Sequence, residues 1–273
     1  MRIVNLIENT EGRKGCEFAH GLSFYIETKT HRVLMDLGPS EKTIANARIL
    51  GIELEKADTV ILSHGHYDHS GGIMPFSGIN KSAVIYMQKN APGDFYSQSG
   101  DEYRYIGIDK EIGKLPQVRF IDGDHVIDEE LSLFVIERRV TEVPFTNSRL
   151  KVKTALGYEQ DDFCHEQALV VTSGGKKVLL SGCAHNGIIN ILEEYKRKYG
   201  SDPDVAISGF HLAKKGEYSE KEMKEIEGIA QELIKYHTKF YTCHCTGLDA
   251  YDTMKGIMGE QLEYVHTGEE LFF

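Results

Sequence analysis

Residues 59–72 impose the strongest constraint on what this chain can fold into. Residues 59–62 are mostly β-branched, as expected of a short buried strand, and His64, His66, Asp68 and His69 follow directly. A strand that ends in a turn directs alternate side chains into one small volume. We therefore expect His64 and His66 to bind one metal ion, while Asp68 and His69 turn toward a second position.

The side chains of this motif also restrict which metal would bind. Imidazole and carboxylate ligands suit zinc, iron or manganese, whereas copper(I) would favour thiolates or thioethers. The alternative is a histidine-rich surface turn, or buried histidines bonded to the backbone. Gathering four metal-binding side chains at one strand end brings no packing benefit, so this alternative explains the pattern poorly. We predict two divalent metal ions, with zinc as the first choice and iron or manganese as the others.

The second half of the chain repeats one arrangement three times. Its apolar patterns predict strands over residues 177–181, 204–208 and 240–242. A histidine follows each strand, namely His185, His211 and His244, and a predicted helix comes after each histidine. Strand-to-helix crossovers bring the carboxyl ends of strands to one side of a sheet, where ligands gather. These histidines should therefore lie near the motif of residues 59–72.

Together the two halves supply a ligand set for each metal position. We expect one ion to be held by His64, His66 and His185. We expect the other to be held by Asp68, His69 and His244.

These residues resemble a known family. The stretch 60–72 is similar to the signature of the metallo-β-lactamase superfamily, whose members are four-layer αββα sandwiches with one or two metal ions in a cleft at the sheet edges. The resemblance covers nearly the whole chain and implies this mixed α/β fold. Further stretches resemble a prokaryotic branch of metal-dependent hydrolases that includes the dihydropterin ribofuranosylaminobenzene phosphate synthase of methanopterin biosynthesis. They are residues 20–26, 34–38, 166–169, 181–185, 209–212 and 243–247.

The chain departs from the superfamily pattern at two ligand positions. The usual third histidine falls near residues 164–167, so His165 is an alternative to His185 at the first ion. The usual bridging aspartate falls near Cys183, which lies two residues before His185 and so on the same face of an extended segment. Its thiolate is therefore a further candidate ligand.

Other polar residues are candidates for supporting roles. The resemblance implies that Asp36 supports the metal loop by hydrogen bonding, although a turn-stabilising aspartate would look the same. We expect Asp68 to act in catalysis as well as in binding. His211 is the candidate general acid or substrate-phosphate contact. His20 and Arg139 are candidates for contacts with the substrate or with the ligands.

Composition narrows the class of protein. The 273 residues are 41% apolar without an obvious linker, which favours one domain over 1–273. A net charge of −11 makes nucleic acid an improbable partner. No stretch approaches the ~20 apolar residues that span a bilayer, so no membrane association is expected. Five cysteines fit reduced thiols in a cytoplasmic protein. The oligomeric state stays open, a homo-oligomer included.

Residues 90–162 are irregular and predict an inserted lid within the domain. Strand-like stretches at 118–121 and 131–136 should belong to the main sheets, and the remainder should face the substrate. Its aromatic residues could equally serve packing. The candidate lid residues are Phe95, Tyr96, Tyr103, Tyr105, Phe145, Arg104, Arg138, Arg139 and Arg149.

These features predict a metal-dependent hydrolase, or a related transferase, that uses a metal-bound hydroxide. Its substrate would be a small molecule, either an ester, a phosphoester or a pterin-like metabolite. One alternative is a di-iron redox enzyme of the flavodiiron type, but those relatives carry a glutamate where this motif has His66 and a fused flavodoxin domain. Another alternative is a non-catalytic metal-binding sensor.

Overall fold

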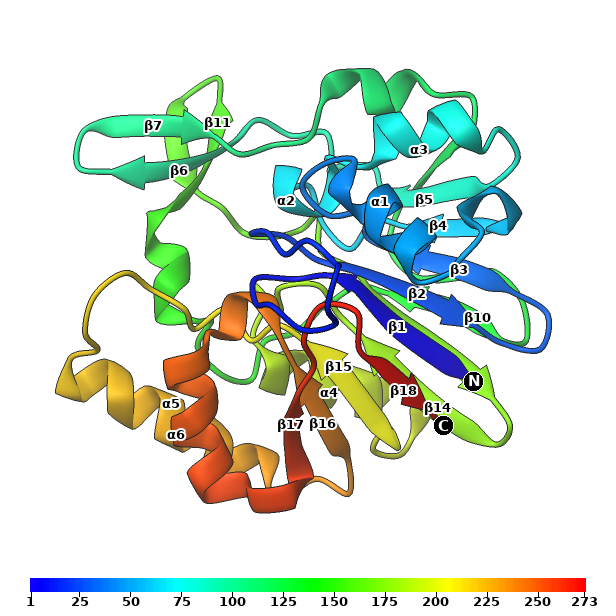
Figure 1. Ribbon diagram of the computed structural model, residues 1–273. Helices are drawn as coiled ribbons and strands as arrows, with labels where there is room; N and C mark the ends of the chain where they lie inside the picture. Colours follow the sequence, from blue (N-terminus) through cyan, green and yellow to red (C-terminus); the bar gives the residue numbers. More distant parts are fainter.

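The computed structural model describes residues 1–273 and is built around two seven-stranded sheets (Figure 1). In spatial order, the first sheet consists of β18 (Glu270–Phe272), β1 (Arg2–Ile7), β2 (Ser23–Glu27), β3 (Arg32–Met35), β4 (Thr59–Ile61), β5 (Val84–Gln88) and β8 (Val118–Ile121). The second consists of β17 (Leu262–Tyr264), β16 (Lys239–Thr242), β15 (Val205–Ser208), β14 (Lys176–Leu180), β13 (Ala168–Ser173), β10 (Leu131–Phe134) and β9 (His125–Val126).

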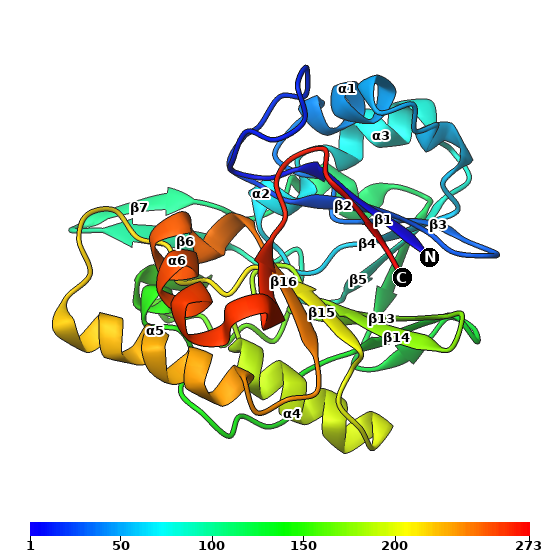
Figure 2. The ribbon, with the colours of Figure 1, turned by 60° about the horizontal axis from the view of Figure 1, so that its bottom comes forward.

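Three apolar cores hold the layers together. The middle core lies between the sheets and combines residues such as Phe24 and Met35 of the first sheet with Leu169 and Leu180 of the second. The outer cores bury the remaining sheet faces under helices. The helices α1 (Lys42–Ile49) and α3 (Ile73–Ile79) cover the first sheet, and α4 (Ile188–Tyr199), α5 (Glu220–Leu233) and α6 (Leu248–Met258) cover the second (Figures 1 and 2). This is the predicted four-layer αββα sandwich.

The direction of the central strands decides where polar loops gather. β3, β4 and β5 are mutually parallel in the first sheet, and β14, β15 and β16 are mutually parallel in the second. Their carboxyl ends are therefore next to one another within each sheet, and the loops that follow them carry the candidate ligands. The loop after β4 leads into the short helix α2 (Tyr67–Ser70).

Local sequence signals explain several element boundaries. Helix α5 begins with a capping box, in which the Ser219 hydroxyl accepts a hydrogen bond from the Glu222 amide and the Glu222 side chain accepts one from the Ser219 amide. Helix α4 ends at Gly200, whose φ of 77° suits glycine. None of the helices has both the length and the apolar character needed to cross a bilayer.

The inserted segment contributes to three sheets. As predicted, residues 118–121 form β8 of the first sheet, and β10 of the second ends at Phe134, slightly earlier than predicted. Strand β9 also joins the second sheet, and the remaining four strands of the segment form a separate sheet beside the sandwich (Figure 1). Its spatial order is β12 (Gly157–Gln160), β11 (Leu150–Thr154), β6 (Phe95–Ser99) and β7 (Glu102–Tyr105).

A histidine joins the two large sheets at the end opposite to these carboxyl ends. The His31 Nδ1 atom lies 2.9 Å from an Asp58 oxygen just before β4, and its Nε2 atom lies 2.6 Å from an Asp128 oxygen between β9 and β10. Burial lowers the pKa of the His31 imidazole, but hydrogen bonds and charge attraction to the two carboxylates outweigh it and raise this pKa above its ordinary value.

We expect the stabilisation from His31 to depend on pH. Because the folded pKa is raised, this stabilisation is fully present below the unfolded pKa of about 6.5 and is lost as pH rises through the folded value. His31→Gln should therefore reduce the free energy of unfolding more at about pH 6 than at about pH 9. Urea titrations of both proteins at the two pH values measure this. In a background with Asp58→Asn and Asp128→Asn the difference should disappear, and a difference that persists there would contradict the assignment.

Candidate metal centre

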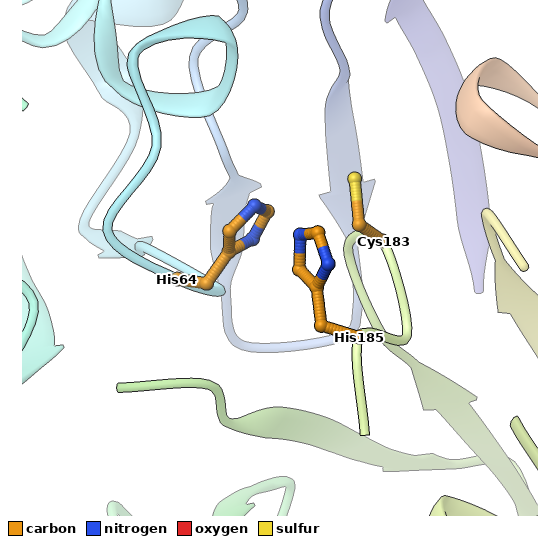
Figure 3. A group of neighbouring side chains, drawn as sticks. All are labelled: His64, Cys183 and His185. Carbon is orange, nitrogen blue, oxygen red and sulfur yellow. The ribbon is translucent and has the colours of Figure 1, made fainter. Parts of the chain in front are cut away.

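The loops after β4, β14 and β16 bring five histidines and a cysteine into one buried cluster. Figure 3 shows the rings of His64 and His185 next to each other, with the Cys183 side chain beside His185. Nitrogen atoms of His64 and His185 and the Cys183 sulfur all lie within 4.8 Å of one another. The same limit holds for His69, Cys183 and His244. Cys183 therefore belongs to both groups and lies between the two predicted metal positions.

Hydrogen bonds to Nδ1 orient the imidazoles. The Nδ1 atom of His69 lies 2.6 Å from an Asp36 oxygen, that of His185 lies 3.0 Å from Asn147 Oδ1, and that of His244 lies 2.7 Å from Asn9 Oδ1. The Nδ1 atom of His64 lies 2.8 Å from the Ser63 hydroxyl. Oxygen acceptors at Nδ1 fix the tautomer that leaves the lone pair on Nε2, as is common for metal-binding histidines.

The Nε2 atoms show that these residues fit a metal. Buried polar atoms are nearly always hydrogen-bonded, because an unpaired one loses its water without compensation. Four histidine Nε2 atoms in the cluster are buried without a hydrogen-bond partner, namely those of His64, His66, His185 and His244. A divalent ion is the partner that such converging lone pairs fit.

Burial keeps these imidazoles in the neutral form that binds metal. Burial, followed by repulsion from the neighbouring imidazoles, holds the pKa of His64 and His185 well below the ordinary value. Burial and His165 lower the pKa of His66 to about 3, and burial is also the main cause that lowers the pKa of His244 to about 4. His69 differs, because the attraction of Asp36 and Asp68 outweighs burial and raises its pKa.

Asp68 lies beside three histidines, His20, His69 and His244. One of its oxygens lies 3.3 Å from His20 Nε2, 3.5 Å from His244 Nε2 and 3.8 Å from His69 Nε2. Burial opposes ionisation of this carboxyl, but the surrounding imidazoles outweigh it and hold its pKa well below the usual range. The His20 side chain is 59% exposed, so it contacts Asp68 from the solvent side.

The geometry favours His185 over His165 as the third ligand of the first ion. The Nδ1 atom of His165 accepts a hydrogen bond from the Gly65 amide at 2.9 Å, and its Nε2 atom lies 3.1 Å from Asp161. Both nitrogens are therefore engaged. Its ring also packs against Phe95, with centroids 4.0 Å apart. His165 supports the loop that carries His64 and His66.

Asp36 ties the metal loop to the neighbouring strand end. Its carboxylate accepts hydrogen bonds of 2.7 Å from both the amide and the hydroxyl of Ser63, in addition to its contact with His69. The side chain is 1% exposed. The supporting role that the resemblance implied for Asp36 matches these contacts.

Sequence reasoning missed several supporting residues, among them Glu166, Asn147 and Asn9. Glu166 is buried and accepts hydrogen bonds from the amides of His185 and Asn186 at 2.7 and 2.8 Å, which fixes the loop after β14. Asn147 and Asn9 hold His185 and His244 as described. Glu166 stands in a stretch that carries the family resemblance, which was a usable signal. The two asparagines reach the cluster from distant segments and offered none.

The backbone is strained around the cluster. The five non-glycine residues with positive φ all belong to it or contact it, and their φ angles lie between 49° and 60°. They are Asp36, Phe163, Ala184, His211 and His244. Such angles are uncommon for residues with a Cβ atom and tend to occur at functional sites.

A cavity of about 510 Å³ opens onto the cluster. His211 lines it, and the His211 ring centroid lies 4.2 Å from that of His185. The remaining lining residues are Asn9, His20, His66, Tyr67, Asp68, Ser97, Arg104, Ile106, Arg149, Leu150, Cys183, His185, Ala213, Lys214, Lys215, His244 and Cys245.

Two lid expectations need correction. The tyrosines of the small sheet do not line the cavity, because they pack against one another on the other face of that sheet. Tyr96 contacts both Tyr105 and Tyr158, and Tyr103 stacks on Tyr158 with ring centroids 3.8 Å apart. Arg139 also lies outside the cavity. Its guanidinium donates hydrogen bonds to the Asp162 carbonyl and to the Asn186 side chain, so Arg139 stabilises the loop after β14.

The fold and the histidine cluster define a metal-binding αββα protein, and comparison with known proteins identifies the family. Residues 17–217 match the family model of the metallo-β-lactamase superfamily. The chain belongs to this superfamily.

Several relatives are similar over at least nine-tenths of their length. An uncharacterised protein of Methanocaldococcus jannaschii is 29% identical, with 97% of each chain covered. The 7,8-dihydropterin-6-methyl-4-(β-D-ribofuranosyl)-aminobenzene-5'-phosphate synthase of the same organism is 26% identical, with 93% of this chain and 90% of the relative covered. The crystal structure of Tm1679, a metal-dependent hydrolase of the β-lactamase superfamily, is 30% identical with a TM-score of 0.83, covering 100% of this chain and 99% of that one.

Cys183 offers a spectroscopic test of the shared ligand position. Cobalt(II) bound to a thiolate gives a charge-transfer absorption that imidazole and carboxylate ligands do not give. We expect this band in the cobalt-loaded protein and expect Cys183→Ser to abolish it. Cys243→Ser is the matched control, since Cys243 is equally buried but lies in neither group of candidate ligands. A band that survives in Cys183→Ser would exclude Cys183 as a ligand.

Asn9 offers a test of the second position. Asn9→Ala removes the oxygen that orients His244, so the affinity for the second ion should fall about 10–100-fold. Folding should change little, because Asn9 is only partly buried. Metal content after dialysis and the melting temperature of the metal-free protein measure the two effects. Retention of both ions with unaltered affinity would show that this hydrogen bond has no role in binding.

Proposed function

We propose that the protein is a metal-dependent hydrolase, or a related transferase, that acts on a small ester, phosphoester or pterin-like metabolite. The observation that carries the proposal is a cluster of four histidines whose buried Nε2 atoms have no hydrogen-bond partner, three of which, His66, His185 and His244, line a cavity open to small molecules. The superfamily fold supports the hydrolase class, and the relative that makes a pterin compound supports the transferase and the pterin-like substrate.

In this proposal the two ligand groups hold two divalent ions, zinc first and iron or manganese as alternatives. His64, His66 and His185 would hold one ion. Asp68, His69 and His244 would hold the other, with the Cys183 thiolate available to both. Such ions lower the pKa of coordinated water and stabilise charge on the attacking and leaving oxygens.

The protein's own residues would orient the substrate and move protons. The His211 Nδ1 atom lies 2.7 Å from the Thr146 hydroxyl, which itself donates to the His211 carbonyl. Nδ1 therefore carries the proton and the Nε2 lone pair is free. Burial holds the pKa of His211 well below its ordinary value, so this side chain is suited to accept a hydrogen bond from the substrate. It must first gain a proton to act as the general acid that its position in the sequence predicted.

The remaining expectations stay proposals. A small-molecule substrate suits the cavity volume, and no nucleic acid or membrane partner is proposed. The free thiols of all five cysteines fit the reducing cytoplasm. The di-iron redox enzyme and the non-catalytic sensor are not favoured by any specific contact in the cavity.

His66→Ala tests the proposal. The imidazole lines the cavity and its Nε2 atom has no protein partner, so its loss should abolish turnover with little effect on folding. Wild type and variant, both supplied with zinc, iron or manganese, are assayed against a panel of phosphoesters, carboxylic esters and lactones. Circular dichroism checks the fold, and His237→Ala, an exposed histidine outside the cavity, is the control. Full activity in His66→Ala would exclude the mechanism.

A further inference from the structure

Four basic side chains line the same cavity as the histidine cluster, although the protein as a whole is strongly acidic. They are Arg104, Arg149, Lys214 and Lys215. The only carboxylate that lines the cavity is Asp68, which belongs to the cluster itself. From a net charge of −11 over the chain, one would expect more acidic than basic side chains around the cavity. The basic character is therefore local to this cavity.

The small four-stranded sheet determines where Arg104, one member of this basic group, lies. Arg104 of β7 pairs with Ser97 of β6, and Ser97 pairs with Leu150 of β11. Residues directly opposite each other on antiparallel strands share a face, so these three form a row that faces the cavity. Arg149 comes directly before Leu150 in the sequence, as the last residue of the short helix Phe145–Arg149. The same alternation turns the neighbouring tyrosines to the other face.

Contacts to the metal loop fix the position of this row. The Arg104 guanidinium lies 5.7 Å from the ring centroid of Tyr67, which stands between His66 and Asp68 in the sequence. The Tyr67 amide donates a hydrogen bond of 2.9 Å to the Ile106 carbonyl, and His66 forms a β-bridge with Gly107. The segment after β7 is therefore joined to the loop that carries two candidate ligands.

Three of the four charges are available to a ligand. Arg104, Arg149 and Lys215 form no ion pair within the protein, whereas Lys214 lies 2.8 Å from Glu222. Arg149 and Lys215 reach the cavity from different elements, since Lys215 lies in the loop between β15 and α5. Unpaired cations from separate elements around one cavity would repel each other, and an anion between them would offset that repulsion.

We propose that Arg104, Arg149 and Lys215 bind a phosphate group of the substrate that is separate from the bond to be cleaved. This inference rests on the proposed function, because it assumes that the reacting end of the substrate lies at the histidine cluster. One guanidinium group can donate two parallel hydrogen bonds to two oxygens of a phosphate, and a lysine adds a further positive charge. Three cations suit a phosphate dianion better than a single carboxylate. Ile106 and Leu150 also line the cavity and would contact the apolar part of the ligand.

The test uses non-hydrolysable probes on the metal-loaded protein. Alkyl bisphosphonates of increasing chain length are compared by calorimetry with alkyl monophosphonates of the same length. At the chain length that reaches from the histidine cluster to the three basic residues, the second phosphonate should lower Kd about tenfold or more. This is the gain expected for hydrogen bonds to charged groups. The double variant Arg104→Gln/Arg149→Gln should lose this gain while its metal content stays unchanged.

A matched control separates this local effect from net charge. The double variant Arg138→Gln/Lys153→Gln also removes two positive charges, but from exposed residues outside the cavity. It should keep the gain in affinity that the second phosphonate gives. If bisphosphonates of every length bind the wild type no better than monophosphonates, or if Arg104→Gln/Arg149→Gln keeps the gain, the inference is overturned. A probe with a terminal carboxylate that binds as tightly as the bisphosphonate would overturn the choice of phosphate.

The proposed function can fail separately. If monophosphonates do not bind the metal-loaded protein, both proposals are overturned, because the histidine cluster then offers no site for an oxyanion. If monophosphonates bind and the second phosphonate adds nothing, only the inference about Arg104, Arg149 and Lys215 is lost.

Discussion

The Asp36 carboxylate connects the ends of two neighbouring parallel strands, and the histidine cluster depends on that connection. Asp36 follows β3, Ser63 follows β4, and the hydrogen bonds between them hold the start of the metal loop. The same carboxylate orients His69, while the Ser63 hydroxyl orients His64. One buried anion thus positions imidazoles on both sides of Cys183. Its burial is tolerated because each of its contacts comes from a hydrogen-bond donor.

The second sheet contributes the other half of the cluster through loops that need separate support. Glu166 holds the loop of His185, and Glu8 accepts a hydrogen bond of 3.0 Å from the His244 amide. Both acidic side chains come from outside the loops that they stabilise. Each sheet therefore carries half of the candidate ligands on loops that a buried acidic side chain holds in place. The two halves come together only when the middle core between the sheets forms.

The resemblance to the superfamily predicted the four-layer fold, whereas local patterns and strand direction predicted the convergence of the strand-end histidines. Neither predicted Asn9 or Asn147, since a hydrogen bond between distant segments leaves no local pattern. The lid tyrosines were assigned to the wrong face. Alternation along a strand predicts that neighbours point to opposite faces, but it does not predict which face meets the cavity. The structure shows that the face of Ser97 and Arg104, which pair with each other, is the one that lines the cavity.

The strained residues around the cluster have a consequence for how this protein can change. Each left-handed residue such as Ala184 costs on the order of 1 kcal/mol that glycine would avoid. At Ala184, where glycine would remove only a methyl group, the substitution would relieve this strain but would also give the loop that orients His185 more conformational freedom. The strain at Ala184 is therefore linked to the orientation of the His185 imidazole, and relieving one would alter the other.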